Sequence, residues 1–185
     1  MTTALVIIDL QRAIDDPRWA ADGPRNNPQA EANVARLLAA WRAARRPLFH
    51  VRHDSREPDS TYRPDRPGNV FKPQAAPLAG EPVIGKTENS AFVGTRLQTR
   101  LRASGLTDLV IAGVITNNSV EATVRHGANL GFRITLVEDA CFTFAKRDGR
   151  GVLWSSEDVH ALSLANLNGE YCKVATTAEV LDQPG

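Results

Sequence analysis

The chain has 185 residues, of which 42% are hydrophobic and 23% are charged, and its formal net charge is +1. This composition is typical of an ordinary globular protein, and the length fits one domain, so we expect a single domain over residues 1–185. A net charge so close to zero gives no broad field that would attract nucleic acid or an anionic membrane, so neither is expected as a partner.

Short apolar runs rich in β-branched residues alternate with amphipathic stretches along the chain. This alternation is typical of βαβ units, which build a parallel sheet with helices on both faces. The sequence therefore predicts an α/β fold. The six predicted strands are Ala4–Asp9, Pro47–His53, Pro82–Lys86, Asp108–Val114, Arg133–Glu138 and Tyr171–Ala175.

Four helices are predicted between these strands. The first shows the clearest helical spacing, because its apolar residues Val34, Leu37, Leu38 and Trp41 recur every three or four positions. The fourth begins at Ser155, which with Asp158 suits a capping box. The predicted ranges are Pro28–Ala44, Thr95–Ala103, Ser119–Leu130 and Ser155–Leu167.

The first residues, MTTALVIIDLQ, contain a short apolar run without a basic flank. A signal peptide carries such a flank, and a membrane span needs about 20 apolar residues, so neither is expected here. The two cysteines, Cys141 and Cys172, lie far apart without metal-ligand spacing, and they make no disulfide framework. A reducing, cytoplasmic location is the simplest interpretation.

The long segment Asp54–Gly80 is rich in proline, arginine and aspartate. Strands of the same predicted sheet flank it on both sides, so we expect an ordered loop rather than a linker. Long loops in compact domains often cover active sites, and this loop is a candidate for that role.

Three polar residues fall at or just beyond the ends of predicted strands. Asp9 ends the first strand, Lys86 ends the third, and Ser119 follows the fourth and opens the next helix. Because ligands bind at the carboxyl ends of open parallel sheets, we expect the acid, the cation and the hydroxyl to converge there. The helix N-terminus at Ser119 also favours a developing oxyanion.

Each of these residues also has an ordinary structural interpretation. An aspartate after an apolar strand is often a cap or turn former, and a lone lysine at a strand end is usually solvated. A serine at a helix start can be a cap and nothing more. The joint placement of the three residues therefore indicates an α/β enzyme, and it leaves the reaction open.

Several motifs resemble those of a known family. VIIDLQ at residues 6–11, GKTENSAF at residues 85–92 and GVITNNSV at residues 113–120 are similar to the three motif blocks of the isochorismatase-like (cysteine hydrolase) family. FHVRHD at residues 49–54 and the stretch 130–140 are similar to the family as well. The resemblance covers nearly the whole chain, and it implies a Rossmann-like three-layer sandwich with a six-stranded parallel sheet.

The resemblance implies roles for the strand-end residues. In the amidases of the family, the aspartate that matches Asp9 takes the proton of the nucleophile, and the lysine that matches Lys86 holds the charged pair. The residue that matches Ser119 is normally the cysteine that attacks the amide carbon. A cis peptide bond, expected here at Val114–Ile115, directs the N–H groups of Ile115 and Ser119 at the oxyanion.

Serine at position 119 leaves four interpretations open. A serine hydroxyl needs a base when it attacks, and Asp9 is a weak base that a nearby Lys86 weakens further by favouring the carboxylate. First, Ser119 is still the nucleophile of an amide hydrolase. Second, Asp9 is the general acid for hydrolysis of an isochorismate-type enol ether by water. Third, the serine is an engineered replacement for cysteine. Fourth, the protein has lost catalysis and only binds a small molecule.

The presence of both Asp9 and Lys86 favours the hydrolase interpretations over the binding module. We therefore expect a small-molecule hydrolase that cleaves a C–N bond, with enol-ether hydrolysis as the alternative. The candidate substrate-binding residues are Gln11, His53, Phe92 and Asn118.

Neither a metal nor an organic cofactor is expected. Nicotinamidases of this family bind a cation through an Asp-x-His pair, which the stretch 53–56 lacks. Relatives form dimers or tetramers, so we expect a homodimer or homotetramer that acts on a small molecule.

Other residues have weaker claims to a role. Cys141 is an alternative nucleophile, although a small buried hydrophobe is the commoner fate of a free cysteine. Aromatic residues are candidates for the walls of a pocket, with core packing as the competing role: Trp19, Phe71, Phe92 and Phe142. Three arginines are candidates for binding a carboxylate, with simple solvation as the competing role: Arg52, Arg63 and Arg66.

Overall fold

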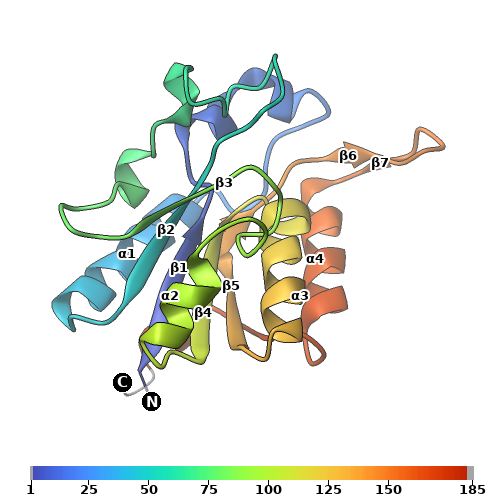
Figure 1. Cartoon of the computed structure of the whole chain (residues 1–185). Coiled ribbons are helices and arrows are strands. Elements are labelled where there is room, and N and C mark those ends of the chain that lie inside the picture. The colour runs from blue at the N-terminus through green and yellow to red at the C-terminus, as the bar shows by residue number, and fades with distance from the viewer. Residues whose placement is uncertain (1, 183–185) are drawn as a thin grey trace.

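The computed structural model describes residues 2–182, so both ends of the predicted domain, Met1 and residues 183–185, lie outside the described residues. A six-stranded sheet forms its centre, in the order β3-β2-β1-β4-β5-β8 (Figure 1). All neighbouring strands in it are parallel, which confirms the predicted α/β fold. The strands are β1 (Thr3–Ile8), β2 (Leu48–His53), β3 (Val83–Lys86), β4 (Asp108–Val114), β5 (Arg133–Phe142) and β8 (Lys173–Ala175).

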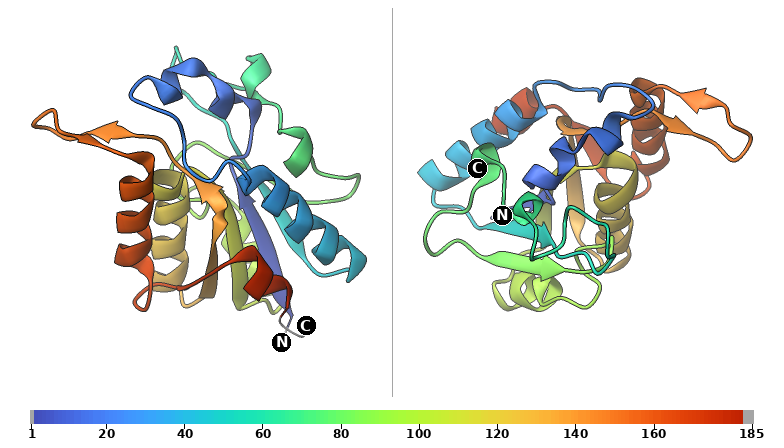
Figure 2. Two further views of the ribbon diagram at one scale, coloured as in Figure 1. Left: turned by 180° about the vertical axis from the view of Figure 1, so that it is seen from behind. Right: turned by 90° about the horizontal axis from the view of Figure 1, so that it is seen from above.

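Helices cover both faces of the sheet and complete three layers (Figures 1 and 2). On one face, α1 (Ala30–Ala43) and the short α5 (Thr177–Leu181) pack in one apolar cluster. On the other face, α2 (Leu97–Ala103), α3 (Glu121–Asn129) and α4 (Ser156–Leu167) pack in a second cluster.

The central strand β1 is buried on both faces because its sequence is almost entirely apolar. Leu5 and Ile7 belong to the cluster beneath α1, while Val6 and Ile8 belong to the cluster beneath α2, α3 and α4. Each such side chain contributes about 1.5–3 kcal/mol when it is fully buried. Since β2 and β4 pair with β1 on its two sides, the position of the next residue, Asp9, is fixed.

Strands and helices begin or end up to four residues from their predicted boundaries, and two of these differences have a clear structural cause. The strand predicted over Arg133–Glu138 continues to Phe142, through a shift of register against β4 between Ile111 and Gly113. The polar residue at this irregularity, Asp139, is satisfied there, because its carboxylate accepts hydrogen bonds from Thr177. The helix predicted from Ser119 begins two residues later, because residues 116–120 form a π-helical turn.

Two further elements were absent from the sequence-based prediction. The capping box of Thr176 and Glu179 begins the short helix α5. An antiparallel hairpin, β6 (Lys146–Arg147) and β7 (Leu153–Trp154), projects from the molecule between β5 and α4 (Figures 1 and 2). Strands of two residues carry too little periodicity to be recognised in a sequence.

The segments that connect β1 to α1 and β2 to β3 both lie over the carboxyl ends of the strands (Figures 1 and 2). Each forms short 3-10 turns, at Arg12–Asp15 and Pro17–Ala20 in the first and at Pro67–Asn69 and Pro73–Ala75 in the second. The predicted loop Asp54–Gly80 is therefore ordered and caps the edge of the sheet where ligands bind in such folds.

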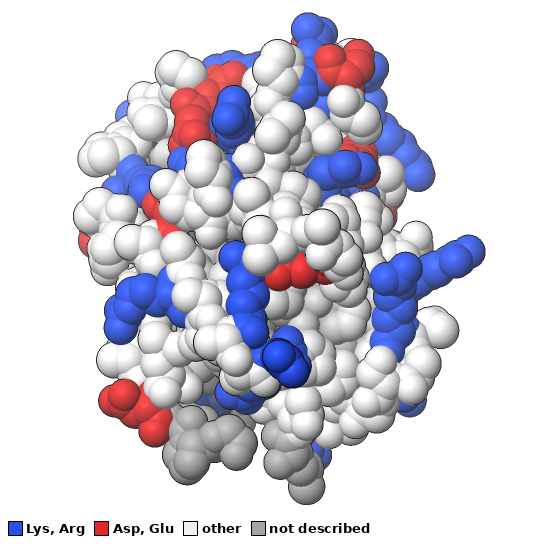
Figure 3. Space-filling model, turned by 90° about the vertical axis from the view of Figure 1, so that its left-hand side faces the viewer, with Lys and Arg blue, Asp and Glu red and all other residues white. Residues whose placement is uncertain are grey.

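The outer surface mixes charges of both signs. On the face in Figure 3, Lys and Arg side chains are spread among uncharged ones, with Asp and Glu between them. Among residues 2–182, no helix is long and apolar enough to cross a membrane.

The close approach of β1 and β4 depends on Gly113. Its φ is +127°, and a Cβ at this position would lie 2.2 Å from the carbonyl oxygen of Ile8. We expect Gly113→Ala to lower the free energy of unfolding by about 3 kcal/mol or more, as the sum of backbone strain and overpacking. Chemical denaturation followed by circular dichroism measures the change.

Gly131 provides the control, because its φ of +87° is also positive but a Cβ at this position would meet no part of the described chain within 4 Å beyond its own neighbours in sequence. Gly131→Ala is expected to cost only about 1–2 kcal/mol for the backbone conformation. Equal losses in the two variants would contradict the importance of the contact between Gly113 and Ile8.

Candidate active site

Asp9 follows β1 in a backbone conformation that few non-glycine residues adopt, with φ at +49°. Its amide donates a hydrogen bond to the carbonyl of Val51 at 3.0 Å. Its own carbonyl accepts from the amide of Gln11 at 2.8 Å and from the hydroxyl of Tyr62 at 3.4 Å. The backbone is thereby held on three sides, and the carboxylate is fixed at the end of the central strand.

Lys86 ends β3, two strands away from β1 in the sheet. Adjacent strands lie about 4.8 Å apart, so only a long side chain can span β2 and reach the carboxylate of Asp9. The Lys86 ammonium donates to Asp9 Oδ2 at 2.6 Å, to the Glu88 carbonyl at 3.0 Å and to Ser119 Oγ at 3.3 Å. It also lies 3.2 Å from Nδ1 of His53, which is its partner in the register between β2 and β3.

Ser119 lies in the π-helical turn 116–120 between β4 and α3. Such turns are rare and are often found at functional sites. The Thr123 hydroxyl donates to the carbonyl of Ser119 at 2.7 Å and ties the turn to the first turn of α3. The peptide bond Val114–Ile115, which was expected to be cis, is cis in this structure.

The predicted convergence of the three polar residues is therefore present. Asp9 Oδ2 and Ser119 Oγ lie within about 6 Å of each other, since the two oxygens are 2.6 and 3.3 Å from the same Lys86 nitrogen. All three side chains are buried.

Burial dominates the electrostatics of Asp9. It raises the pKa of the carboxyl group to about 6, and the lowering effect of the Lys86 ammonium only partly offsets it. The expectation that Lys86 makes Asp9 a weaker base is confirmed in direction, because the ammonium lowers the pKa of the carboxyl group. The net result differs from the sequence-based expectation of a weak base, because burial raises that pKa by more than Lys86 lowers it. Among the described residues, no group is hydrogen-bonded to the buried Oδ1 of Asp9, so this oxygen can accept or hold a proton.

A cavity of about 120 Å³ opens beside these residues. Its walls come from the segment after β1, the end of β2, the loops after β2 and β3, and the turn after β4. The lining residues are Asp9, Ile14, Trp19, His53, Ser60, Tyr62, Asn89, Val114, Ile115, Asn118 and Ser119.

Three further predicted site residues line this cavity besides Asp9 and Ser119, and a fourth stands directly behind its wall. His53, Asn118 and Ile115 are part of the wall, while Lys86 stands behind it and contacts Asp9 and Ser119.

Gln11 is placed outside the cavity, and its expected role in substrate binding is corrected. The side-chain amide is fully buried and spans three backbone groups. It donates to the carbonyls of His53 and Asn69 at 3.0 and 2.9 Å and accepts from the amide of His53 at 2.7 Å. Gln11 therefore holds His53 in place and has no amide group left for a ligand.

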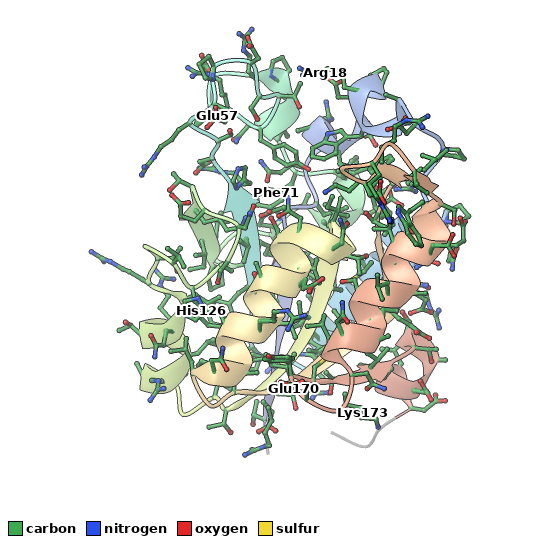
Figure 4. The ribbon with its side chains drawn as sticks, turned by 90° about the vertical axis from the view of Figure 1, so that its right-hand side faces the viewer. Arg18, Glu57, Phe71, His126, Glu170 and Lys173 are labelled. Carbon is green, nitrogen blue, oxygen red and sulfur yellow. The ribbon has the colours of Figure 1, made fainter. Side chains whose placement is uncertain are left out.

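Phe92 is also placed outside the cavity. It is buried in the core beneath α2 and α3, where its ring stacks on Phe132 and lies beside His126. His126 bonds to the hydroxyl of Ser90 and lies on α3, below the rim of the molecule that carries Arg18 and Glu57 (Figure 4). The substrate-binding role predicted for Phe92 is therefore corrected to core packing.

The aromatic, arginine and cysteine candidates also divide into residues that line the cavity and residues that do not. Of the four aromatic residues proposed to line a pocket, only Trp19 lines this cavity. Arg52 pairs with Asp54 and Arg63 with Asp65, and none of the three candidate arginines is part of the wall. Cys141 is fully buried, and burial raises the pKa of its thiol to about 12, which excludes it as a ready nucleophile.

Four residues of the wall were missed by the sequence analysis: Ile14, Ser60, Tyr62 and Asn89. Asn89 lies inside the motif at residues 85–92, so the motif could have identified it as a candidate site residue. The other three belong to irregular segments whose side-chain directions have no periodic pattern. Tyr62 contacts both Trp19 and His53 edge to face, and with Ser60 it forms the part of the cavity wall that the long loop provides.

Within residues 2–182, no group of three or more His, Cys, Asp or Glu side chains is arranged to hold a metal ion. The arrangement that remains is a buried carboxylate with a free oxygen, a hydroxyl, and an ammonium between them. These groups can exchange a proton with a substrate and attack or bind its polar atoms.

Residues 3–179 match the family model of the isochorismatase domain. The uncharacterized isochorismatase family protein YrdC of Bacillus subtilis (strain 168) is 36% identical over 179 residues, which cover 97% of this chain and 94% of that protein. Ureidoacrylate amidohydrolase of Methylobacterium radiotolerans is 28% identical over 199 residues, covering 90% of this chain and 73% of that protein.

A crystal structure of an isochorismatase-family protein from Chromobacterium violaceum ATCC 12472 is similar throughout. It matches with a TM-score of 0.93 at 58% sequence identity, over 97% of this chain and 92% of that one.

The contacts of Gln11 predict that its loss affects folding more than it affects ligand recognition. Gln11→Ala leaves buried backbone groups of His53 and Asn69 without a partner, so the free energy of unfolding should fall by about 2–4 kcal/mol. Urea denaturation measures this, with Gln74→Ala as the control, because Gln74 is exposed and its replacement should change stability by less than about 0.5 kcal/mol. A Gln11 variant of unchanged stability would contradict the structural role.

Proposed function

The chain belongs to the isochorismatase family and is a hydrolase of that family, and we propose that it hydrolyses a C–N bond of a small amide at the Asp9, Lys86 and Ser119 site. The observation that carries the proposal is the Lys86 ammonium, which contacts both the Asp9 carboxylate and the Ser119 hydroxyl beside a cavity. The similarity to an enzyme named an amidohydrolase supports the choice of an amide.

In the first half of the proposed reaction, Ser119 Oγ attacks the carbonyl carbon of the amide and its proton passes to Asp9 Oδ1. The carbonyl π electrons move to the oxygen, and the N–H groups of Ile115 and Ser119 stabilise the oxyanion. When the intermediate collapses, the C–N bond breaks and Asp9 returns the proton to the leaving nitrogen. An amine or ammonia departs, and an acyl ester remains on Ser119.

In the second half, water attacks the ester carbon while Asp9 again takes a proton. Collapse of this second intermediate breaks the bond to Ser119 Oγ, and Asp9 returns the proton to that oxygen. The carboxylic acid product leaves and the starting enzyme is restored. One water molecule is consumed and the charge on the protein is unchanged.

Burial of Asp9 supports a serine nucleophile. A carboxylate with its pKa near 6 takes a proton more readily than one at the ordinary value of 3.8. The Lys86 ammonium fixes the carboxylate through Oδ2, and its longest contact is the one to Ser119. The hydroxyl is thus oriented by Lys86 and keeps lone-pair density for attack.

A second candidate is hydrolysis of an enol ether by water, with Asp9 as general acid. The raised pKa of Asp9 favours this candidate too, because a larger fraction of the carboxyl group is protonated near neutral pH. Ser119 would then only hydrogen-bond to the substrate. The two mechanisms need opposite protonation states of Asp9 in the free enzyme.

The pH dependence of kcat/KM distinguishes the two mechanisms. If Asp9 takes the proton of Ser119, it must start as a carboxylate, so activity should rise with pH along a limb with an apparent pKa near 6. Ammonia release from a panel of small primary amides between pH 4.5 and 8.5 provides the measurement. A limb that falls above about pH 6 would instead identify Asp9 as the acid.

Replacement of Ser119 tests the covalent step. Ser119→Ala should lower kcat for amides at least about 100-fold, whereas Ser119→Cys should stay active, because a thiol is the stronger nucleophile. Intact-mass spectrometry of Ser119→Cys during turnover should show an acyl adduct. Ser104→Ala is the control, since Ser104 is exposed at the end of α2. Undiminished amide turnover in Ser119→Ala would refute the nucleophile.

A further inference from the structure

We infer that the substrate is a small uncharged amide, and that His53, neutral and protonated on Nε2, donates a hydrogen bond to it. This inference deepens the proposed amide hydrolysis and rests on it. Three features of the cavity carry the inference: the tautomer of His53, the absence of a free cation among the described residues of the wall, and the neutral character of the remaining polar groups.

The neighbour of His53 fixes its tautomer. An ammonium group only donates hydrogen bonds, so Nδ1 of His53, 3.2 Å from Lys86 Nζ, must be the acceptor. In the neutral ring the proton then resides on Nε2. Burial, together with the nearby Lys86 charge, lowers the pKa of His53 to about 4, so the ring is neutral near pH 7.

The Nε2–H group of His53 is available to a ligand. Gln11 holds the backbone of His53 on both its amide and its carbonyl, and the ring packs edge to face on Tyr62. The residue lines the cavity. No hydrogen bond to Nε2 is formed within residues 2–182, so an acceptor on the substrate is its natural partner.

The charges of the site compensate one another before any ligand arrives. Asp9 is the one charged residue among the described lining residues, and Lys86 neutralises it from behind the wall. The three protons of the Lys86 ammonium are shared among four neighbouring acceptors, which leaves none for a substrate anion. Charged side chains are instead spread over the outer surface (Figure 3).

A charged substrate would therefore lose its hydration without gaining a partner. Burying an unpaired ion is far more costly than burying a neutral amide that finds hydrogen bonds. The wall offers such bonds through the neutral side chains of Ser60, Asn89 and Asn118, next to the apolar surfaces of Ile14 and Trp19. The volume of about 120 Å³ restricts the substrate to a small molecule.

Three amides of similar length test the charge preference: butanamide, succinamate and 4-aminobutanamide, which carry no charge, a negative charge and a positive charge at the far end. Binding is measured by ¹H–¹⁵N NMR on the Ser119→Ala protein, through the side-chain signals of Asn89 and Asn118. Butanamide should give saturable shifts. Neither charged amide should saturate at concentrations at least about tenfold higher.

Paired variants test His53. In Ser119→Ala protein, His53→Asn keeps an acceptor near Lys86 but loses the donor towards the cavity, and it should weaken butanamide binding about tenfold. His53→Gln places an amide N–H near the position of Nε2 and should recover most of that loss. His126→Asn is the control, because His126 lies on α3 and is not part of the cavity wall, and it should bind butanamide as the parent does.

The ¹⁵N shifts of the His53 ring report its tautomer directly. A protonated Nδ1, equal binding of succinamate and butanamide, saturable binding of 4-aminobutanamide at the same concentrations, or saturation by none of the three would each overturn the inference. Ammonia release by the wild-type protein tests the proposed function separately. Selective binding of butanamide without release of ammonia from any amide would leave the inference on binding standing and reject amide hydrolysis.

Discussion

The ion pair of Asp9 and Lys86 sets the properties of the rest of the site. Taking a carboxylate and an ammonium out of water costs several kcal/mol for each ion, and the cost is recovered only when the pair is close and its other hydrogen bonds are satisfied. The Lys86 ammonium meets this condition with four neighbours. Asp9 meets it only in part, because Oδ1 has no partner among the described residues. This missing hydrogen bond leaves Oδ1 able to accept a proton or donate one to a substrate.

The order of the strands explains why these residues meet. β1 lies between β2 and β4, so the carboxylate that follows β1 is flanked by His53 at the end of β2 and by the turn after β4 that contains Ser119. Lys86 reaches across from β3. A parallel sheet thus brings together four residues that are distant in the sequence, and the close contact of Gly113 with Ile8 keeps β1 and β4 at the distance that the arrangement needs.

Much of this could be predicted from the sequence. Apolar runs that end in a polar residue indicated the parallel sheet and the positions of Asp9 and Lys86, and the predicted start of the next helix indicated Ser119. Gln11 and Phe92 were wrongly predicted to bind substrate because they lie within the motifs. The direction of their side chains depends on tertiary packing, which the motifs do not show. Ile14 and Tyr62 could not be assigned, since they lie in irregular segments. The basicity of Asp9 was underestimated, because sequence reveals a neighbouring charge more readily than the degree of burial.

Direct titration of the Asp9 carboxyl group tests the central claim of a buried, partly satisfied ion pair. The measurement is ¹³C NMR of protein labelled at aspartate carboxyl carbons, with Asp9→Asn to assign the signal. We expect a pKa near 6 in the wild-type protein and a higher value in Lys86→Met, which removes the charge that lowers it. A wild-type pKa at or below the ordinary aspartate value of 3.8 would contradict the account.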